Sequence, residues 1–411
     1  MTKRLNLFAF ICITILLAGC WNHRELTDIG IIAAVGIDYG QDKRYNMTFQ
    51  FVNPKNIAGN QQTSGLSGPA ITIYESEGDN LLEAARAASQ HVSRQLYFAH
   101  TNVLMIGEEV ARDGLTDILD ISIRNPDFRS TATIVIAKDS TAEQILKTLT
   151  PLDQIPANKI DKTLQFSESR WGENIHLTVG ELVPTIYSKS KQAVVSGFVL
   201  KGDKEKGKQD ANIQSSRPLA PLNADGIGIF KGDKLITWAE GKTARGINWI
   251  LNNIQSTVMA VDWKDKKDAF GITINLSKSK ISANVKNNKP HITVHIDAEG
   301  GITEADTFLD LSKAEELIKV QNALRKEIKK EIENSIQFAQ KHKADVFGFG
   351  EKISQVDEVY WKKVADVWNE EIFPNLEVKV EVNAFIRRTY LISKPFLYEH
   401  KGNDKTWKTQ N

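Results

Sequence analysis

The residue with the clearest chemistry in this sequence is a cysteine close to the amino terminus. Only two cysteines occur, Cys12 and Cys20, so the chain after Trp21 cannot form disulfides, thiolate zinc sites or a cysteine nucleophile. Cys20 ends the sequence Leu-Ala-Gly-Cys, in which an apolar residue and two small residues precede a thiolate that can be acylated. This is the pattern of a bacterial lipobox. It predicts signal cleavage between Gly19 and Cys20 and lipidation of Cys20.

The residues before Cys20 have the organisation of a signal peptide, which we place at 1–19. Lys3 and Arg4 supply a positive start, and the mainly apolar run Leu5–Leu17 is shorter than the roughly 20 apolar residues of a spanning helix. The alternative is an ordinary signal peptide that happens to end near a cysteine. Two or more acyl chains on Cys20 would anchor the chain stably. Because no later run approaches the length of a spanning helix, we expect the rest of the protein outside the membrane, close to its surface.

No other pattern in the sequence predicts a catalytic or metal site. The eight histidines form no His-Glu-x-x-His motif. His291 and His295 would share one face of a strand without a third ligand at suitable spacing, so we expect surface or edge histidines. Nucleophile-elbow and phosphate-binding glycine patterns are absent, and Gly348-Phe349-Gly350 follows a predicted helix, which favours a helix-ending turn. The sequence therefore predicts a protein that is not an enzyme and has neither a cofactor nor a metal.

The composition is that of a folded globular protein with two or three domains. Of 411 residues, 41% are hydrophobic and 25% are charged, which are ordinary values for folded proteins. The formal net charge is +1, and loss of residues 1–19 removes Lys3 and Arg4 but no acid, which leaves the mature chain at −1. So small a net charge does not attract nucleic acid, and we therefore expect no nucleic-acid partner.

The first part of the mature chain, 20–150, has the pattern of a mixed α/β domain. Apolar runs at Ile29–Asp38 and Arg44–Val52, separated by a turn, predict a hairpin. Asp79 is a candidate cap for a helix whose apolar residues recur at helical spacing. The other predicted elements are strands at Ile71–Glu75, Asn102–Ile106 and Thr131–Ala137 and helices at Glu108–Ile123 and Thr141–Leu149.

Prolines just after position 150 mark a change in the sequence. We predict a small middle domain over 151–220, in which Thr178–Glu181 resembles a helix start and Lys201–Gln214 is a polar loop. A C-terminal domain over 221–400 and a polar tail over 401–411 complete the predicted organisation.

The C-terminal domain combines long strands with one long helix. Strands at Phe270–Val285 and His291–Glu299 predict an antiparallel sheet. A capping box at Ser312–Glu315 opens the helix, whose apolar stripe we expect to pack on this sheet rather than on a partner helix or a membrane. The predicted fold class is thus α+β or mixed α/β in several domains. It has an N-terminal mixed sheet with helices and a C-terminal antiparallel sheet packed by a long helix.

Several of these segments together resemble one known family. The run Gly19–Asp28, which contains Cys-Trp-x-x-Arg-Glu, and the strand that follows it are similar to the start of the Ger(x)C spore germination lipoproteins, the C subunits of germinant receptors. The resemblance covers nearly the whole mature chain. It continues through Leu96–His100, Arg124–Arg129, Gly228–Trp238, Gly246–Trp249, Asp345–Gly350 and Val378–Arg387.

The resemblance implies a three-domain lipoprotein on the outer surface of the inner spore membrane. The family pattern places acylation on Cys20 and supplies no catalytic residue, and the internal turns would serve folding or assembly. The implied partners are two polytopic membrane subunits of the receptor, of the A type and the B type. Together they would respond to the nutrients that end dormancy.

The leading hypothesis is therefore a non-enzymatic receptor subunit that binds membrane partners. Its main rival is a solute-binding lipoprotein of a transporter, a class with two α/β lobes around a cleft, which the antiparallel second half does not favour. Tight binding of small nutrients by the isolated chain would favour this rival. A third function, an envelope hydrolase, would need a nucleophile or metal cluster that the sequence lacks.

Overall fold

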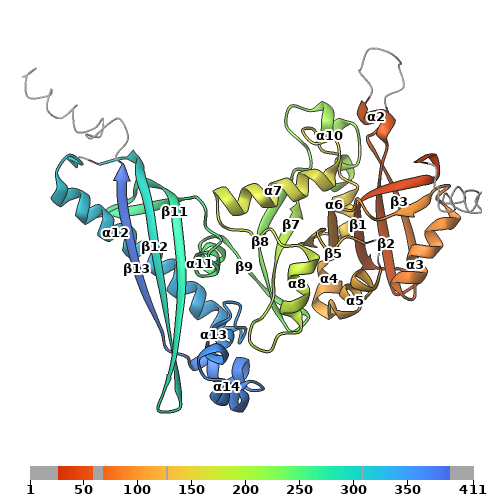
Figure 1. Cartoon of the computed structure of the whole chain (residues 1–411). Helices are drawn as coiled ribbons and strands as arrows, with labels where there is room; N and C mark the ends of the chain where they lie inside the picture. Colours follow the sequence, from red (N-terminus) through yellow and green to blue (C-terminus); the bar gives the residue numbers. More distant parts are fainter. Residues whose placement is uncertain (1–25, 59–67, 126–127, 308, 389–411) are drawn as a thin grey trace, which may run out of the picture.

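A large mixed sheet forms the first half of the molecule. The computed structural model describes residues 26–58, 68–125, 128–307 and 309–388. The strands of this sheet are β1 (Ile29–Tyr39), β2 (Tyr45–Val52), β3 (Ile71–Gly78), β4 (Gln95–Tyr97), β5 (Val103–Gly107), β6 (Thr133–Ala137), β7 (Val194–Leu200), β8 (Leu222–Lys231) and β9 (Lys234–Ala239). They pair in the order β3-β2-β1-β5-β6-β7-β8-β9, and β4 adds to β1 (Figure 1).

The centre of this sheet is parallel and its two ends are antiparallel. β1, β5, β6 and β7 run parallel because the connections between them contain helices. The pairs within β1-β2-β3 and β7-β8-β9 are antiparallel. The predicted hairpin is confirmed, with Ile37 opposite Met47 and Tyr39 opposite Tyr45. β1 is almost entirely apolar because both of its faces are covered.

Helices cover both faces of the large sheet. They are α2 (Pro54–Ala58), α3 (Leu81–Ala87), α4 (Glu108–Asp113), α5 (Thr116–Arg124), α6 (Ala142–Leu146), α7 (Pro156–Arg170), α8 (Val179–Ile186), α9 (Lys204–Gly207) and α10 (Ala211–Gln214), with 3-10 turns at Leu26–Asp28 and Ala88–Gln90. On one face α3, α4, α5 and α8 pack with Ile32, Val35 and Ile37 of β1. On the other face α6 and α7 pack with Ala33 and Ala34. Side chains of β1 thus enter two separate cores, and the adjacent Ala33 and Ala34 share one of them at a register shift in the β1-β2 pairing.

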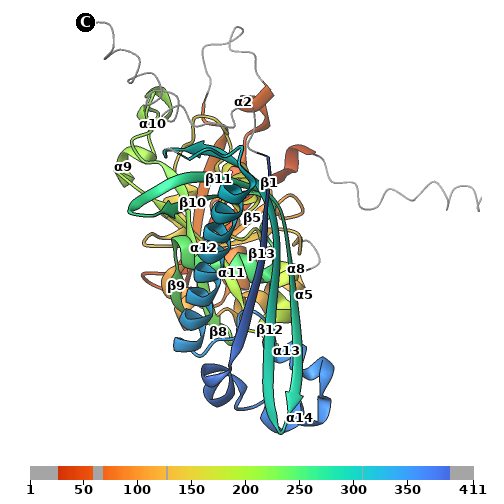
Figure 2. The same ribbon diagram turned by 90° about the vertical axis from the view of Figure 1, so that its left-hand side faces the viewer.

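The second half is a four-stranded sheet packed by helices. Its strands are β10 (Thr257–Trp263), β11 (Lys266–Lys286), β12 (Lys289–Ala305) and β13 (Val378–Arg388), paired in that order. The helices are α11 (Gly241–Leu251), α12 (Ala314–Lys341), α13 (Phe349–Val356) and α14 (Glu358–Val364), followed by a π-helical turn at Trp368–Ile372 and a 3-10 turn at Phe373–Asn375. Figures 1 and 2 show α12 running along β13. Val320, Leu324 and Ile328 of its apolar stripe lie in the core with this sheet, as expected.

The direction of the last strand differs from the all-antiparallel sheet that the sequence predicts. β10, β11 and β12 are antiparallel, but β13 is parallel to β12, with Val294 opposite Val380. Between these strands the chain passes through α12, α13 and α14, and such a helical crossover joins parallel strands. The predicted fold class is otherwise confirmed, with an N-terminal mixed sheet, helices, and a C-terminal sheet packed by a long helix.

The ends of the long helix also differ from the prediction. Ser312 does not cap it, because its hydroxyl donates to Asp310 at 2.5 Å, and α12 begins only at Ala314. At the other end α12 stops at Lys341. Gly348, which we expected to end this helix, instead has a φ of 75° and precedes α13.

The two sheets are joined by one hydrophobic core. Ile227 and Ile229 of β8 pack in the same cluster as α11 and the C-terminal strands. Asn248 of α11 is fully buried and donates to the backbone oxygens of Gly172 at 2.8 Å and Asn174 at 3.0 Å. β7, from the predicted middle segment, lies between β6 and β8 in the large sheet. The domain boundaries near residues 150 and 220 stay a prediction.

Candidate functional site

The predicted lipidation site lies outside the described residues. Cys20 and the cleavage position Gly19 precede Leu26, the first residue that the structure describes. Acylation of Cys20 therefore stays a prediction. The site that the described residues do define is a cavity in the first half of the molecule.

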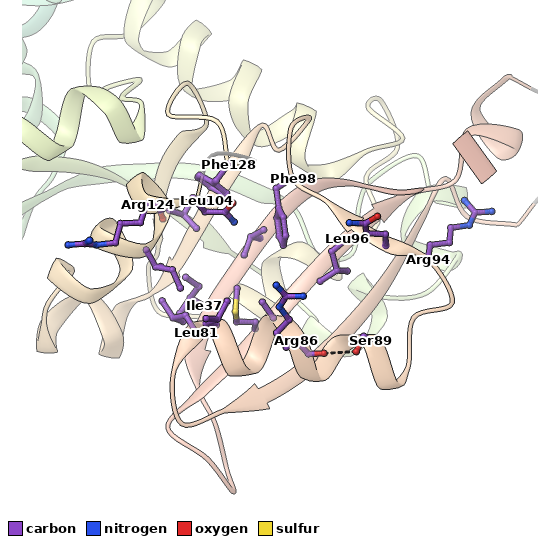
Figure 3. A pocket seen from close by; sticks show the side chains of 18 residues that line it. Ile37, Leu81, Arg86, Ser89, Arg94, Leu96, Phe98, Leu104, Arg124 and Phe128 are labelled. Carbon is purple, nitrogen blue, oxygen red and sulfur yellow. Dashed lines mark hydrogen bonds between the residues drawn. The ribbon is translucent and has the colours of Figure 1, made fainter. Parts of the chain in front are cut away.

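This cavity opens between α3, α5 and the large sheet and has a volume of about 580 Å³ (Figure 3). Small-molecule sites occupy roughly 300–1,000 Å³. Apolar side chains of β1, β2 and β5 form its floor: Val35, Ile37, Met47 and Leu104. Its walls come from α3, α5 and the segments after them: Leu81, Leu82, Ala85, Arg86, Ser89, Arg94, Gln95, Leu96, Phe98, Ile121, Ser122, Arg124, Asn125 and Phe128.

The first turn of α3 positions one wall of the cavity. Asn80 Oδ1 accepts the amide of Glu83 at 2.9 Å. Asn80, and not Asp79 as the sequence suggested, is therefore the N-cap. The hydroxyl of Ser76 on β3 donates to the backbone oxygen of Ala84 at 2.6 Å. The cap fixes the start of α3, and the Ser76 bond holds the helix against β3.

The segment after α3 forms the opposite wall. β4 pairs in parallel with the start of β1, where Leu96 lies opposite Gly30. Phe98 then packs edge-on against Phe49 of β2, with ring centroids 6.3 Å apart. The strand pair and the aromatic pair together fix Leu96 and Phe98 at the cavity.

Two motifs that carry the family resemblance meet at this cavity. Leu96 and Phe98 belong to the first, and Arg124 and Phe128 belong to the turn that begins with Arg124. The family resemblance implies a role in folding or assembly for both motifs. No pattern in the sequence could show their contact, because it depends on β4 returning to pair with β1.

Arginines supply the charge at this otherwise apolar site. Figure 3 shows Arg86 between the apolar side chains of α3 and Phe98, with Arg94 and Arg124 at opposite ends. Arg124 Nε donates to Asp120 at 2.7 Å. Arg86 and Arg94 form no ion pair with any described residue. Within the described part of the chain, no acidic group therefore neutralises their positive charge.

The serines of the wall are already engaged. Ser89 Oγ donates to the backbone oxygen of Arg86 at 2.7 Å, and Ser122 Oγ donates to that of Ile118, also at 2.7 Å. Their hydroxyl protons are thus used within the helices. The guanidinium groups are the strongest polar feature that remains for a ligand.

A buried carboxylate explains the motif at Asp345–Gly350. Burial raises the pKa of Asp345 to about 6, although five donors favour its charged form. Oδ1 accepts three successive backbone amides at 3.0–3.2 Å, and Oδ2 accepts the Gly350 amide at 2.8 Å and Trp368 Nε1 at 2.9 Å. Asp345 thereby joins the end of α12 to α13 and the π-helical turn. Its role is in folding.

A second buried carboxylate positions α6. Asp38, at the end of β1, accepts the amides of Ala142 and Glu143 at 2.9 Å each. Burial raises the pKa of Asp38 to about 6, against the opposing effect of these two amides. A Cβ at Gly107 would lie 2.3 Å from Asp38 Oδ1, so the carboxylate occupies the space next to this glycine.

Three of the described histidines show where the histidine side chains lie. His291 and His295 share the outer face of β12, partly exposed, and His295 Nε2 is 3.1 Å from Asp297 Oδ1. In the loop between α7 and α8, His176 Nε2 is 2.8 Å from Asp161 Oδ1 of α7, and this hydrogen bond raises the pKa of His176. Within the described ranges, no group of three His, Cys, Asp or Glu residues is arranged to hold a metal ion.

The fold and these motifs define the class of protein. Residues 22–199 match the family described as "Spore germination protein N-terminal domain", and residues 225–390 match "Spore germination B3/ GerAC like, C-terminal". The chain belongs to this GerAC-like family of spore germination proteins, the C-subunit family of germinant receptors. Membership confirms the predicted family and makes the chain a non-catalytic receptor subunit.

Individual relatives match almost the entire chain. Spore germination protein KC of Bacillus subtilis (strain 168) is 38% identical over 95% of this chain and 96% of the relative. Spore germination protein B3 of the same organism is 24% identical over 89% and 93%. The crystal structure of the GerBC protein shares the fold, with a TM-score of 0.53 and 21% identity over 86% of this chain and 96% of that one. Every helix in the described part of the chain is too short or too polar to cross a bilayer.

Proposed function

We propose that this receptor subunit is lipid-anchored, held on the outer face of the inner spore membrane by acyl chains on Cys20. It acts there with the polytopic A-type and B-type membrane subunits in nutrient-triggered germination. The observation that carries the proposal is the 38% identity to Spore germination protein KC across 95% of the chain. The Leu-Ala-Gly-Cys sequence supports the anchor.

Few residues separate Cys20 from the large sheet, so acyl chains on Cys20 would hold the sheet on a short tether. The N-terminal family match begins at residue 22, two positions after the cysteine. The six residues from Cys20 to Glu25, which precede Leu26, can extend at most about 20 Å. Acyl chains on Cys20 would therefore keep the large sheet close to the membrane surface, where polytopic partners can be reached.

The rival function, a solute-binding lipoprotein of a transporter, is less well supported. Proteins of that kind hold the solute in a cleft between two lobes. Here the cavity lies within the first half, between helices and one sheet, while a shared core joins the two halves. Membership of the spore germination family also favours the receptor subunit.

Replacement of the acylated residue tests the anchor. Cys20→Ala should leave the fold intact, because the residue precedes every described element. It should release the protein from the inner spore membrane, since no acyl chain then holds it, and slow germination through its receptor. Cys12→Ala, which removes the only other thiol, is the control. Immunoblots of membrane and soluble fractions, and the fall in absorbance after nutrient addition, measure the two effects.

Two results would contradict the anchor. One is unchanged membrane retention of Cys20→Ala, and the other is a free thiol on Cys20 in mass spectra of the native protein. Partnership is tested separately by cross-linking in spore membranes. The polytopic subunits should be recovered with a tagged copy of this chain, and their absence would argue against the receptor complex.

A further inference from the structure

The cavity between α3, α5 and the large sheet has an interior that suits an apolar group. Its floor side chains Ile37, Met47 and Leu104 are buried, and Leu96 and Phe98 extend the apolar surface up the wall. Transfer of an apolar group from water to such a surface is favourable. The volume of about 580 Å³ admits a small molecule.

The described side chains at the cavity carry positive charge, and no described acid compensates that of Arg86 or Arg94. Arg86 is exposed in the last turn of α3 and has no ion-pair partner among the described residues. The nearby acid on the same helix, Glu83, is engaged by Lys43 and by the Asp79 amide, so it does not neutralise Arg86. Of the other two arginines, Arg124 pairs with Asp120, and Arg94 has no ion-pair partner among the described residues. No described acid therefore occupies the guanidinium groups of Arg86 and Arg94, which can bind an anion.

The lining also disfavours other ligand classes. None of the described side chains that line the cavity is acidic, so a cation finds no counter-charge. The hydroxyl protons of Ser89 and Ser122 are donated to backbone oxygens, which leaves few groups for a sugar or another polyol. An apolar floor beside free arginines matches a molecule with both an apolar part and a negative charge.

We infer that this cavity binds a small amphipathic anion, which places its apolar group on the floor formed by Ile37, Met47 and Leu104 and its carboxylate or phosphate against Arg86. Two sources share this chemistry, a free fatty-acid-like carboxylate and an anionic membrane lipid. The inference does not depend on acylation of Cys20 or on the partner subunits.

Calorimetric titration of the mature chain carrying Cys20→Ser, in the absence of detergent, tests this site. Decanoate, below its micelle concentration, should bind saturably, and decanol, which has the same chain without charge, should bind more weakly. Arg86→Glu should weaken decanoate binding by about tenfold or more and leave decanol binding unchanged. Ala85→Trp, which fills the cavity from α3, should abolish both.

A matched control separates the site from general surface charge. Arg170, like Arg86, is an exposed arginine in the last turn of its helix, but it lies outside the cavity. Arg170→Glu should leave decanoate binding unchanged. Circular dichroism confirms the fold of each variant, and if Ala85→Trp fails to fold, the comparison of Arg86→Glu with Arg170→Glu still decides the question.

Vesicles distinguish the two sources of the ligand. Flotation with phosphatidylglycerol vesicles that requires Arg86 identifies the membrane lipid, whereas decanoate binding without flotation identifies a free amphiphile. Both outcomes support an amphipathic anion. The inference is overturned if neither decanoate nor these vesicles bind, or if Arg86→Glu and Arg170→Glu reduce binding equally.

Discussion

Asp38 and Asp345 are buried carboxylates whose partners are mainly backbone amides rather than cations. Asp38 lies at the end of β1 and positions α6. Asp345 follows α12 and positions α13. A sequence shows that an acid is present, but it does not show that the acid is enclosed. Such residues therefore resemble surface acids until the fold is known.

We expect Asp38 to make stability depend on pH. Its pKa of about 6 in the folded chain exceeds the ordinary value of 3.8, so the native state holds a proton that the unfolded state releases. The contribution of Asp38 to the free energy of unfolding is therefore greatest below about pH 4 and is lost as the pH rises through about 6. The slope is at most about 1.4 kcal/mol per pH unit.

Urea unfolding across this pH range measures the effect. The free energy of unfolding of Asp38→Asn should depend less steeply on pH than that of the unmodified chain, because asparagine does not titrate. Asp139→Asn, at an exposed position just before α6, is the control and should keep the original slope. Equal slopes for Asp38→Asn and the unmodified chain would contradict the prediction.

At the scale of elements, the contact between α11 and α12 is unusually close. A Cβ at Gly246 would lie 2.3 Å from the backbone oxygen of Glu331 and 2.8 Å from Ser335 Cβ. The neighbouring Arg245 binds the Glu331 carboxylate with two nitrogens, at 2.6 and 3.0 Å, in the interior. The glycine lets the helices approach, and the ion pair between them is fully enclosed.

Gly246→Ala should therefore destabilise the protein by roughly 1–3 kcal/mol, because the added methyl group forces α11 and α12 apart. The loss should appear even though alanine favours a helix by about 1 kcal/mol over glycine. Lys242→Ala, at an exposed position of the same helix, is the control and should change the free energy of unfolding by less than about 0.5 kcal/mol. If urea unfolding finds Gly246→Ala as stable as the unmodified chain, the close approach of α11 and α12 at this glycine does not contribute to stability.

Hydrophobic periodicity predicted most elements, because it reflects burial that each segment carries locally. The hairpin of β1 and β2 is a confirmed example. The helix start at Thr178–Glu181, which was predicted from its polar residues, is also confirmed and forms the capping box of α8. Contacts between distant segments were not predictable. The parallel direction of β13 and the position of Phe98 and Phe128 at one cavity both depend on them. The amphipathic-anion site has no local signature in the sequence for the same reason.

At the scale of the whole molecule, polar contacts reinforce the core that joins the two sheets. Ile229 of β8 and Phe270 of β11 belong to the same cluster. The amide of Gln192, before β7, donates to the backbone oxygen of Asp345 at 2.8 Å. Because apolar and polar contacts both cross the junction, we expect the halves to unfold together rather than as independent units.

Asn248→Ala tests this coupling. The change leaves the backbone oxygens of Gly172 and Asn174 without their buried donor, at a cost of about 1–3 kcal/mol. Calorimetry should show one transition in the unmodified chain and one transition at lower temperature in the variant. Asn322→Ala, at an exposed position on α12, should leave the midpoint nearly unchanged. Two separated transitions in the unmodified chain would show that the halves are independent.

The crossover that sets β13 beside β12 also determines when the second half can be completed. Residues 306–377 separate the two strands, so the edge of β12 stays open until most of the polypeptide has been synthesised. A product truncated before Val378 would present that bare edge next to the uncovered apolar side of α12, and open strand edges recruit other chains. Premature termination should therefore yield aggregates rather than a shorter working subunit.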